Sequence, residues 1–135
     1  MAMSNYDVIF IDDETTMIDI FTQYVNWKYR HWRACSFVDS QDVFDKITAN
    51  QLSAVVWIVD IMMPRKNGTQ IAAAITRECG PGTIIVGYTA LDSHTLESRP
   101  EYKDGMKYFS RIINKQENFN NLLDLVDAWV KQKAN

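Results

Sequence analysis

The chain has 135 residues, which is the usual size of one domain built around one hydrophobic core. Apolar residues make up 47% and charged residues 23%, a globular balance that excludes disordered, collagen-like and coiled-coil chains. The net charge of −3 gives no electrostatic reason to expect nucleic-acid binding. No apolar run approaches the roughly 20 residues that cross a bilayer. We therefore expect a single domain over 1–135, with neither a nucleic-acid nor a membrane partner.

The first residues contain neither a basic segment nor a long apolar stretch, so we expect no signal peptide and a cytoplasmic location. The two cysteines, Cys35 and Cys79, are too few for a disulfide framework and are interpreted as reduced packing residues. His31 and His94 are far apart and belong to no ligand-spaced cluster, which argues against a zinc site.

Apolar runs alternate with amphipathic segments along the whole chain, and the spacing of apolar residues separates strands from helices. In chain order, we expect a strand over 8–11, a helix over 15–27, an edge strand over 32–37, a helix after a cap at 39–40, a strand over 54–59, a helix from 68 to about 80, a strand over 83–88, a weak helix over 92–99 cut by Pro100, a strand over 106–113 and a helix over 117–131.

Five strands alternating with five helices predict an α/β fold, with one parallel sheet covered by helices on both faces. Within that class we choose the flavodoxin-like three-layer sandwich with strand order 2-1-3-4-5. In such sheets the ligand site lies at the carboxyl ends of the strands, where strands one and three meet.

Polar residues follow four of the predicted strands and should meet at that edge. They are Asp12 and Asp13 after the first strand, Asp60 after the third, Thr89 after the fourth and Lys115 after the fifth. Close carboxylates repel one another unless they share protons or recruit a cation, and an open oxygen-rich site suits Mg²⁺. A carboxylate beside Mg²⁺ can attack a phosphoryl group and form an aspartyl phosphate. Taken singly, each residue is more often a helix cap, a turn residue or a surface charge.

The motifs at these strand ends resemble the receiver domain of two-component response regulators. Asp12-Asp13-Glu14 resembles the family's acidic pair, and Asp60-Ile61-Met62-Met63-Pro64 with Asn67-Gly68 resembles its phosphoacceptor motif. Thr89-Ala90 resembles the switch threonine and the residue after it, and Lys115 stands at the usual distance before the last helix.

The resemblance implies a role for each of these residues. Asp60 would accept a phosphoryl group from a sensor histidine kinase or a histidine phosphotransfer protein. Asp13 and Asp60 would bind Mg²⁺ directly, Met62 through its backbone carbonyl and Asp12 through water. Thr89, Ala90 and Lys115 would contact the phosphoryl group. The domain would then change its surface for an unidentified output partner, could dimerise on phosphorylation, and would catalyse no reaction beyond its own phosphorylation and dephosphorylation.

The chain departs from the family pattern in three places. Gln116 stands where the family has a cis-proline, so we expect either a trans bond with a shifted loop or a strained cis bond. Ile112 occupies the position of the aromatic switch residue, for which Phe109 or Tyr108 could substitute, and Lys107 or Arg111 could replace Lys115 as the cation. The segment between Thr89 and Lys115 is also longer than usual, and Pro100 should shorten its helix.

Two other functions compete with the phosphorylated receiver. One is a pseudo-receiver that serves as an interaction module without phosphorylation, which Gln116 and the altered segment before it favour. The other is an aspartyl-phosphate phosphatase, but those enzymes resemble an Asp-x-Asp motif after the first strand, where this chain has Asp12 and Glu14.

Overall fold

The computed structural model describes residues 3–134, in which five parallel strands form one sheet of order β2-β1-β3-β4-β5. The strands are β1 (Ser4–Ile11), β2 (Ala34–Phe37), β3 (Leu52–Asp60), β4 (Ile84–Thr89) and β5 (Arg111–Asn114). The helices are α1 (Thr15–Trp27), α2 (Ser40–Thr48), α3 (Gly68–Cys79), α4 (Ser93–Ser98), α5 (Pro100–Lys103) and α6 (Phe119–Ala134), with a 3-10 turn η1 (Asp104–Tyr108). The predicted flavodoxin-like topology is confirmed. The outermost positions of the predicted domain, residues 1, 2 and 135, lie outside the described residues.

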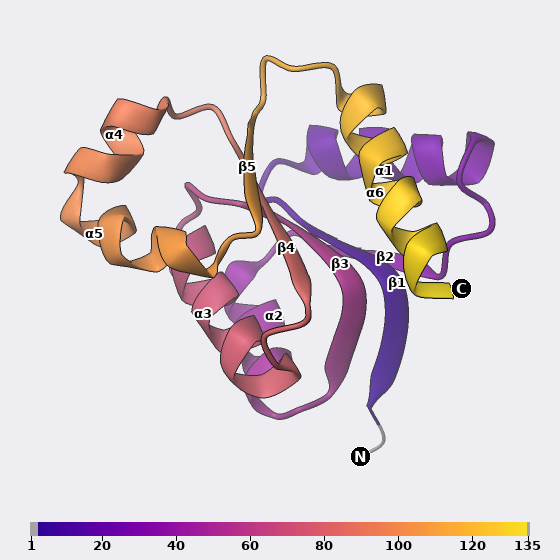
Figure 1. Cartoon of the computed structure of the whole chain (residues 1–135), viewed down its shortest axis with the longest axis horizontal. Helices are drawn as coiled ribbons and strands as arrows, with labels where there is room; N and C mark the ends of the chain where they lie inside the picture. The colour runs from indigo at the N-terminus through magenta and orange to yellow at the C-terminus, as the bar shows by residue number, and fades with distance from the viewer. Residues whose placement is uncertain (1–2, 135) are drawn as a thin grey trace.

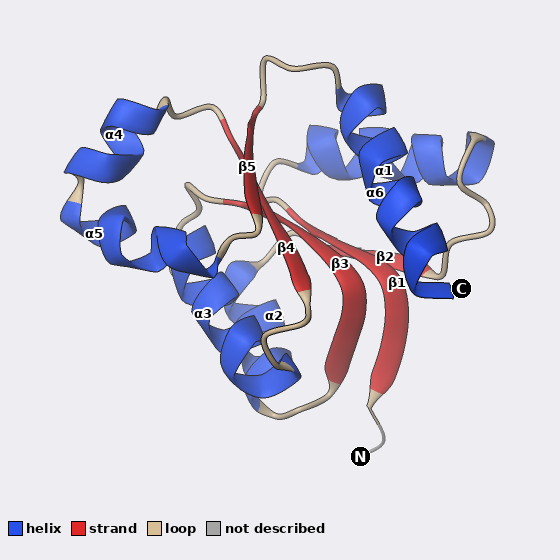
Figure 2. Cartoon of the chain, viewed as in Figure 1, coloured by secondary structure: helices blue, strands red, loops and turns tan. Residues whose placement is uncertain are grey.

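The helices cover both faces of the sheet, α1 and α6 on one and α2 and α3 on the other (Figures 1 and 2). Successive residues of a strand point to opposite faces, so Val8 and Phe10 pack under α1 and α6 whereas Ile9 and Ile11 pack under α2 and α3. Where both faces are buried, in residues 8–11 of β1 and 56–59 of β3, the central strands are entirely apolar, and these runs made them recognisable in the sequence. No helix within residues 3–134 is long and apolar enough to cross a membrane.

The segment between β4 and β5 differs most from the prediction. The weak helix expected over 92–99 is α4, which ends at Ser98, and Pro100 begins a further short helix, α5, followed by η1, so the expected total of five helices is too low. The strand expected over 106–113 is wrong in its first half, because residues up to Tyr108 belong to η1. Met106 packs instead against a small core containing Leu96 and Tyr102.

β5 is short because the chain leaves η1 only at Tyr108. It pairs with β4 from Val86 to Thr89, and this pairing places Asn114 directly beside Thr89. The residue after β5 therefore lies at the same sheet edge as the ends of β1, β3 and β4.

Candidate functional site

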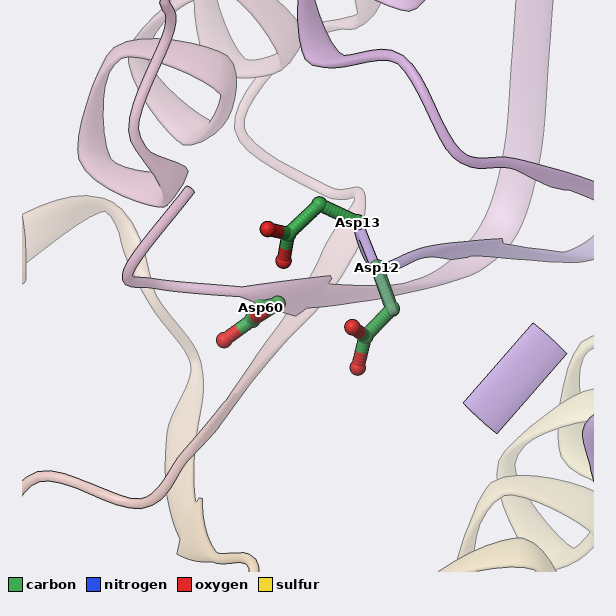
Figure 3. A group of neighbouring side chains, drawn as sticks. All are labelled: Asp12, Asp13 and Asp60. Carbon is green, nitrogen blue, oxygen red and sulfur yellow. The ribbon is translucent and has the colours of Figure 1, made fainter. Parts of the chain in front are cut away.

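Three aspartates meet at the carboxyl edge of the sheet. Asp12 and Asp13 follow β1, and Asp60 is the last residue of the adjacent strand β3. One carboxylate oxygen from each of the three lies within 4.8 Å of the others, and Figure 3 shows their side chains around a common space. The sequence-based expectation that these residues converge is met.

Burial makes this cluster unfavourable when it is fully charged. Asp12 is 0% exposed and Asp60 3% exposed, whereas Asp13 is partly exposed. Burial, with the nearby charge of Asp12 next in size, raises the pKa of Asp60 to about 8. Burial likewise raises the pKa of Asp12. A cation among these oxygens would reverse both effects, because it stabilises the charged carboxylates.

Lys115 supplies part of that positive charge. Its Nζ lies 3.0 Å from Asp12 Oδ2, 3.4 Å from Asp60 Oδ2 and 3.5 Å from Glu14 Oε1. Burial alone would lower the pKa of Lys115, but the charges of Asp60 and Asp12 hold that pKa above its usual value. Lys115 is thus charged and is shared among three carboxylates.

One buried oxygen of the cluster remains poorly satisfied. Asp12 Oδ2 accepts no hydrogen bond of good geometry, although Lys115 Nζ is 3.0 Å away, so we interpret their contact as ionic and not as a directed hydrogen bond. Asp12 Oδ1 accepts a hydrogen bond from the backbone N–H of Glu14 at 2.9 Å. A buried carboxylate oxygen with spare capacity, beside two further carboxylates, fits the hard oxygen ligands that Mg²⁺ prefers.

Thr89 and Ala90 lie beside the cluster at the end of β4. Thr89 is buried, and its hydroxyl oxygen accepts a hydrogen bond from the backbone N–H of Leu91 at 3.0 Å. The carbonyl of Thr89 accepts a hydrogen bond from the backbone N–H of Lys115 at 2.7 Å, which joins the loops after β4 and β5. Ala90 is exposed.

The loop from β3 to α3 is closed by the Asn67-Gly68 pair. Gly68 donates its N–H to the carbonyl of Ile61 at 2.8 Å, and a Cβ at Gly68 would lie 2.5 Å from the carbonyl oxygen of Asp60. Asn67 caps α3 by accepting from the backbone N–H groups of Thr69 and Gln70. The fixed distance from Asp60 to Gly68 in the motif therefore reflects a tight backbone contact. Within this loop Met62 is 51% exposed.

Although Gln116 stands where the family has a proline, the Lys115 side chain still lies at the carboxylate cluster. No peptide bond within residues 3–134 is cis, so the bond between Lys115 and Gln116 is trans and the alternative of a strained cis bond is wrong. The backbone N–H of Gln116 is held by the side chain of Asn114 at 2.8 Å. The two fallback cations are not needed: Lys107 Nζ lies 5.3 Å from the ring centre of Tyr108, and Arg111 is exposed in β5.

Neither aromatic substitute takes the place of the switch residue in β5. Ile112 occupies that position and is 37% exposed. Tyr108 and Phe109 precede β5 and pack against the core on the α3 face.

Sequence reasoning missed two polar residues near the cluster. Glu14 was quoted as part of the acidic run but was given no role, although it contacts Lys115. Ser40 was recognised as part of a helix cap, yet its hydroxyl contacts the loop after β3. The acidic run itself was a usable signal for Glu14, whereas nothing in the sequence connects Ser40 to that loop.

Comparison with known proteins assigns the chain to a family. The model of the response regulator receiver domain matches residues 8–127. Similar solved structures include the BeF3-activated DrrB receiver domain (TM-score 0.73, 18% identity, covering 95% of this chain and 99% of that one). Another is the receiver domain of the Francisella response regulator 1452 (TM-score 0.71, 18% identity, covering 96% and 99%). A third is the Thermotoga maritima response regulator TrrA in complex with Mg²⁺-BeF (TM-score 0.70, 18% identity, covering 94% and 99%). None of the curated protein sequences matches this chain.

Proposed function

The chain belongs to the response regulator receiver family, and we propose that it accepts a phosphoryl group on Asp60 in a Mg²⁺-dependent reaction. The observation that carries the proposal is the meeting of Asp12, Asp13 and Asp60 around one space, with Lys115 at its edge. The donor would be a sensor histidine kinase or a histidine phosphotransfer protein, which would place the reaction in the cytoplasm.

The residues of the cluster would hold the cation through different ligand atoms. Asp13 and Asp60 would bind Mg²⁺ through their carboxylates, Met62 through its carbonyl oxygen and Asp12 through a water molecule. When bound, Mg²⁺ would neutralise charge on the transferring phosphoryl group. The raised pKa of Asp60, about 8, supports this arrangement, because a neutral carboxyl group is a poor nucleophile and a nearby cation favours its ionised form.

In the transfer, a carboxylate oxygen of Asp60 forms a bond to phosphorus as the bond from phosphorus to the donor breaks. The leaving group, an imidazole or acetate, keeps the electron pair of the broken bond. Lys115 lies 3.4 Å from Asp60 and would pair with an oxygen of the attached phosphoryl group. Thr89 and Ala90 would contact the other oxygens, so that the loop after β4 moves inward and changes the surface offered to an output partner or to a second copy.

The test is to incubate the full chain with acetyl phosphate and Mg²⁺ and to measure the intact mass. We expect the addition of one phosphoryl group, which disappears in Asp60→Asn and when EDTA removes the metal. We also expect no sustained turnover of an unrelated phosphomonoester, in keeping with a signalling domain. Such turnover, abolished by Asp60→Asn, would contradict the proposal and favour a phosphatase.

A phosphorylation-independent interaction module is the second candidate, because Ile112 replaces an aromatic residue and the segment before β5 is split into short helices. The two candidates differ in the response to phosphodonors. No adduct with acetyl phosphate, phosphoramidate or a panel of phosphorylated histidine phosphotransfer proteins would support the second candidate and contradict the first.

A further inference from the structure

Ser40 is a buried hydroxyl residue that lies outside the carboxylate cluster. It is the first residue of α2 and is 3% exposed. Its Oγ donates a hydrogen bond to the carbonyl of Pro64 at 2.7 Å and accepts one from the backbone N–H of Lys66 at 3.2 Å. One side chain of α2 therefore holds the loop after β3 at two points, on either side of Arg65.

The backbone between these two points adopts a conformation that needs support. Arg65 has a φ of 67°, in the left-handed region that residues with a side chain seldom adopt. Its guanidinium Nη1 lies 3.2 Å from Asp39 Oδ1 and 3.1 Å from Asp39 Oδ2, but both side chains are partly exposed, so that water weakens their attraction. The hydrogen bonds of Ser40, a buried residue, are thus better protected from water than the contact between Asp39 and Arg65.

The same loop borders the carboxylate cluster. Asp13, Ser40, Pro64 and Arg65 line one pocket of about 290 Å³. At its other end the loop is closed by the bond from Gly68 N–H to the carbonyl of Ile61. The backbone between Ile61 and Pro64 is therefore fixed at both ends, at Pro64 by Ser40.

From this arrangement we infer that Ser40 is a positioning residue for the divalent cation. Its hydroxyl fixes the backbone of the loop after β3, whose Met62 carbonyl would face the cation together with Asp13. Asp60 itself lies in a strand that is paired on both sides, so its position does not depend on Ser40. The inference rests on the proposed function, because it takes the cluster to be a Mg²⁺ site.

The test is calorimetric titration of the full chain with Mg²⁺, comparing wild type with Ser40→Ala. Groups that orient metal ligands typically contribute 10-fold or more to affinity, so we expect the dissociation constant to rise by about 10-fold. Ser40→Thr keeps the hydroxyl and should retain an affinity within about threefold of wild type. Ser40→Gly removes the hydroxyl in a second way and should weaken binding as Ser40→Ala does, which keeps the test informative if one variant folds poorly.

Ser110→Ala is the matched control. Its hydroxyl also accepts a hydrogen bond from a backbone N–H, that of Ile85 at 3.1 Å, but it lies just before β5, at the end of the sheet away from the cluster. This variant should lose stability without any change in Mg²⁺ affinity. A second readout is the rate of phosphorylation by acetyl phosphate: in Ser40→Ala, half-saturation should require more Mg²⁺, whereas the rate at saturating Mg²⁺ should stay within about twofold of wild type.

The outcomes separate this inference from the proposed function. If wild type binds no Mg²⁺, the proposed function itself fails. If wild type binds Mg²⁺ and the folded Ser40→Ala and Ser40→Gly variants bind it equally well, Ser40 has only a structural role and the inference is overturned. An equal loss of affinity in Ser110→Ala would also overturn it, because the effect would then follow general destabilisation.

Discussion

Lys115 Nζ lies 3.0 Å from Asp12 Oδ2, and the two side chains are brought together from opposite ends of the chain. Asp12 follows β1 at the centre of the sheet, and Lys115 follows the edge strand β5. Asp12 is fully buried and could not remain charged there without a nearby positive charge. Loss of this contact should therefore affect both the stability of the folded protein and the charge of the carboxylates in the candidate site.

Removing this cation should destabilise the protein in the absence of metal. In Lys115→Ala the carboxylates of Asp12 and Asp60 lose their charged partner, and we expect the free energy of unfolding at pH 8 in EDTA to fall by about 1–3 kcal/mol. We expect a smaller loss of free energy than for a fully buried ion pair because the Lys115 side chain is 16% exposed. Urea titration followed by circular dichroism gives the measurement.

Lys107→Ala removes a lysine outside the cluster and serves as the control. It should change the free energy of unfolding by less than about 0.5 kcal/mol. Saturating Mg²⁺ should recover part of the loss in Lys115→Ala, since the bound ion replaces the missing positive charge and stabilises the folded state by mass action. Equal stability of the two variants in EDTA would argue against a structural role for the ion pair.

The pKa of Asp60 predicts how stability depends on pH without metal. Burial, followed by the charge of Asp12, raises this pKa from 3.8 to about 8. At a pH between these two values, Asp60 is protonated in the folded chain and ionised in the unfolded chain. The contribution of Asp60 to stability is thus fully present below about pH 4 and is lost as the pH rises towards 8. The decline cannot exceed about 1.4 kcal/mol per pH unit for a single group.

Asp60→Asn isolates that contribution, because asparagine does not titrate. In EDTA, wild type should lose stability relative to Asp60→Asn as the pH rises from about 4 to about 8, and the difference should then level off. With saturating Mg²⁺ the decline should shrink, since the ion stabilises the charged carboxylate. Urea unfolding curves at four or five pH values measure the difference, and parallel pH profiles in EDTA would show that Asp60 is not protonated on folding.

The strand ends of the site could be predicted because each follows an apolar run. The strand over 54–59 is buried on both faces, so the position of Asp60 at its end followed from the hydrophobic pattern alone. Parallel pairing then places the ends of neighbouring strands at one edge, which is why Asp12, Thr89 and Lys115 were expected near Asp60. These predictions depended on local pattern and on one topological rule.

The segment from Leu91 to Ser110 could not be predicted in the same detail. Its apolar residues Leu96, Tyr102 and Met106 lie on three short helical pieces separated at Pro100 and after Lys103, and they form a small core of their own. The first half of the strand expected over 106–113 was wrong because the apolar spacing over 106–109 suits either a strand or a short helical turn. The hydrogen bonds of the Ser40 side chain could not be predicted either, because they join α2 to the loop after β3 and no sequence pattern connects these two segments.

The close backbone contact at Gly68 predicts that any side chain at this position would destabilise the folded protein. A Cβ there would lie 2.5 Å from the carbonyl oxygen of Asp60 and 2.6 Å from the Cα of Ile61, so Gly68→Ala must displace backbone. We expect a loss of about 1–3 kcal/mol in the free energy of unfolding. Gly82→Ala is the control, since a Cβ at Gly82 meets nothing within 4 Å and should be neutral or slightly stabilising. Similar values for the two variants, from thermal and urea unfolding, would contradict the described loop.

The apolar residues Met62 and Leu91 should prolong the lifetime of the phosphorylated form. Met62 and Leu91 stand two residues after Asp60 and Thr89, and neither apolar side chain can orient an attacking water molecule. Met62→Asn should therefore speed the loss of the phosphoryl group several-fold, because the amide can hold a water molecule by hydrogen bonds. Met62 is 51% exposed, so the substitution should leave the core intact.

Met62→Leu is the matched control, because it changes the shape of the side chain and keeps it apolar. Its phosphorylated form should decay at the wild-type rate. Both variants are phosphorylated with acetyl phosphate, separated from the donor and followed by intact mass over time in the presence of Mg²⁺. Decay of Met62→Asn at or below the wild-type rate would reject the idea that the apolar side chain protects the phosphoryl group, and faster decay of Met62→Leu would attribute the effect to altered packing instead of water.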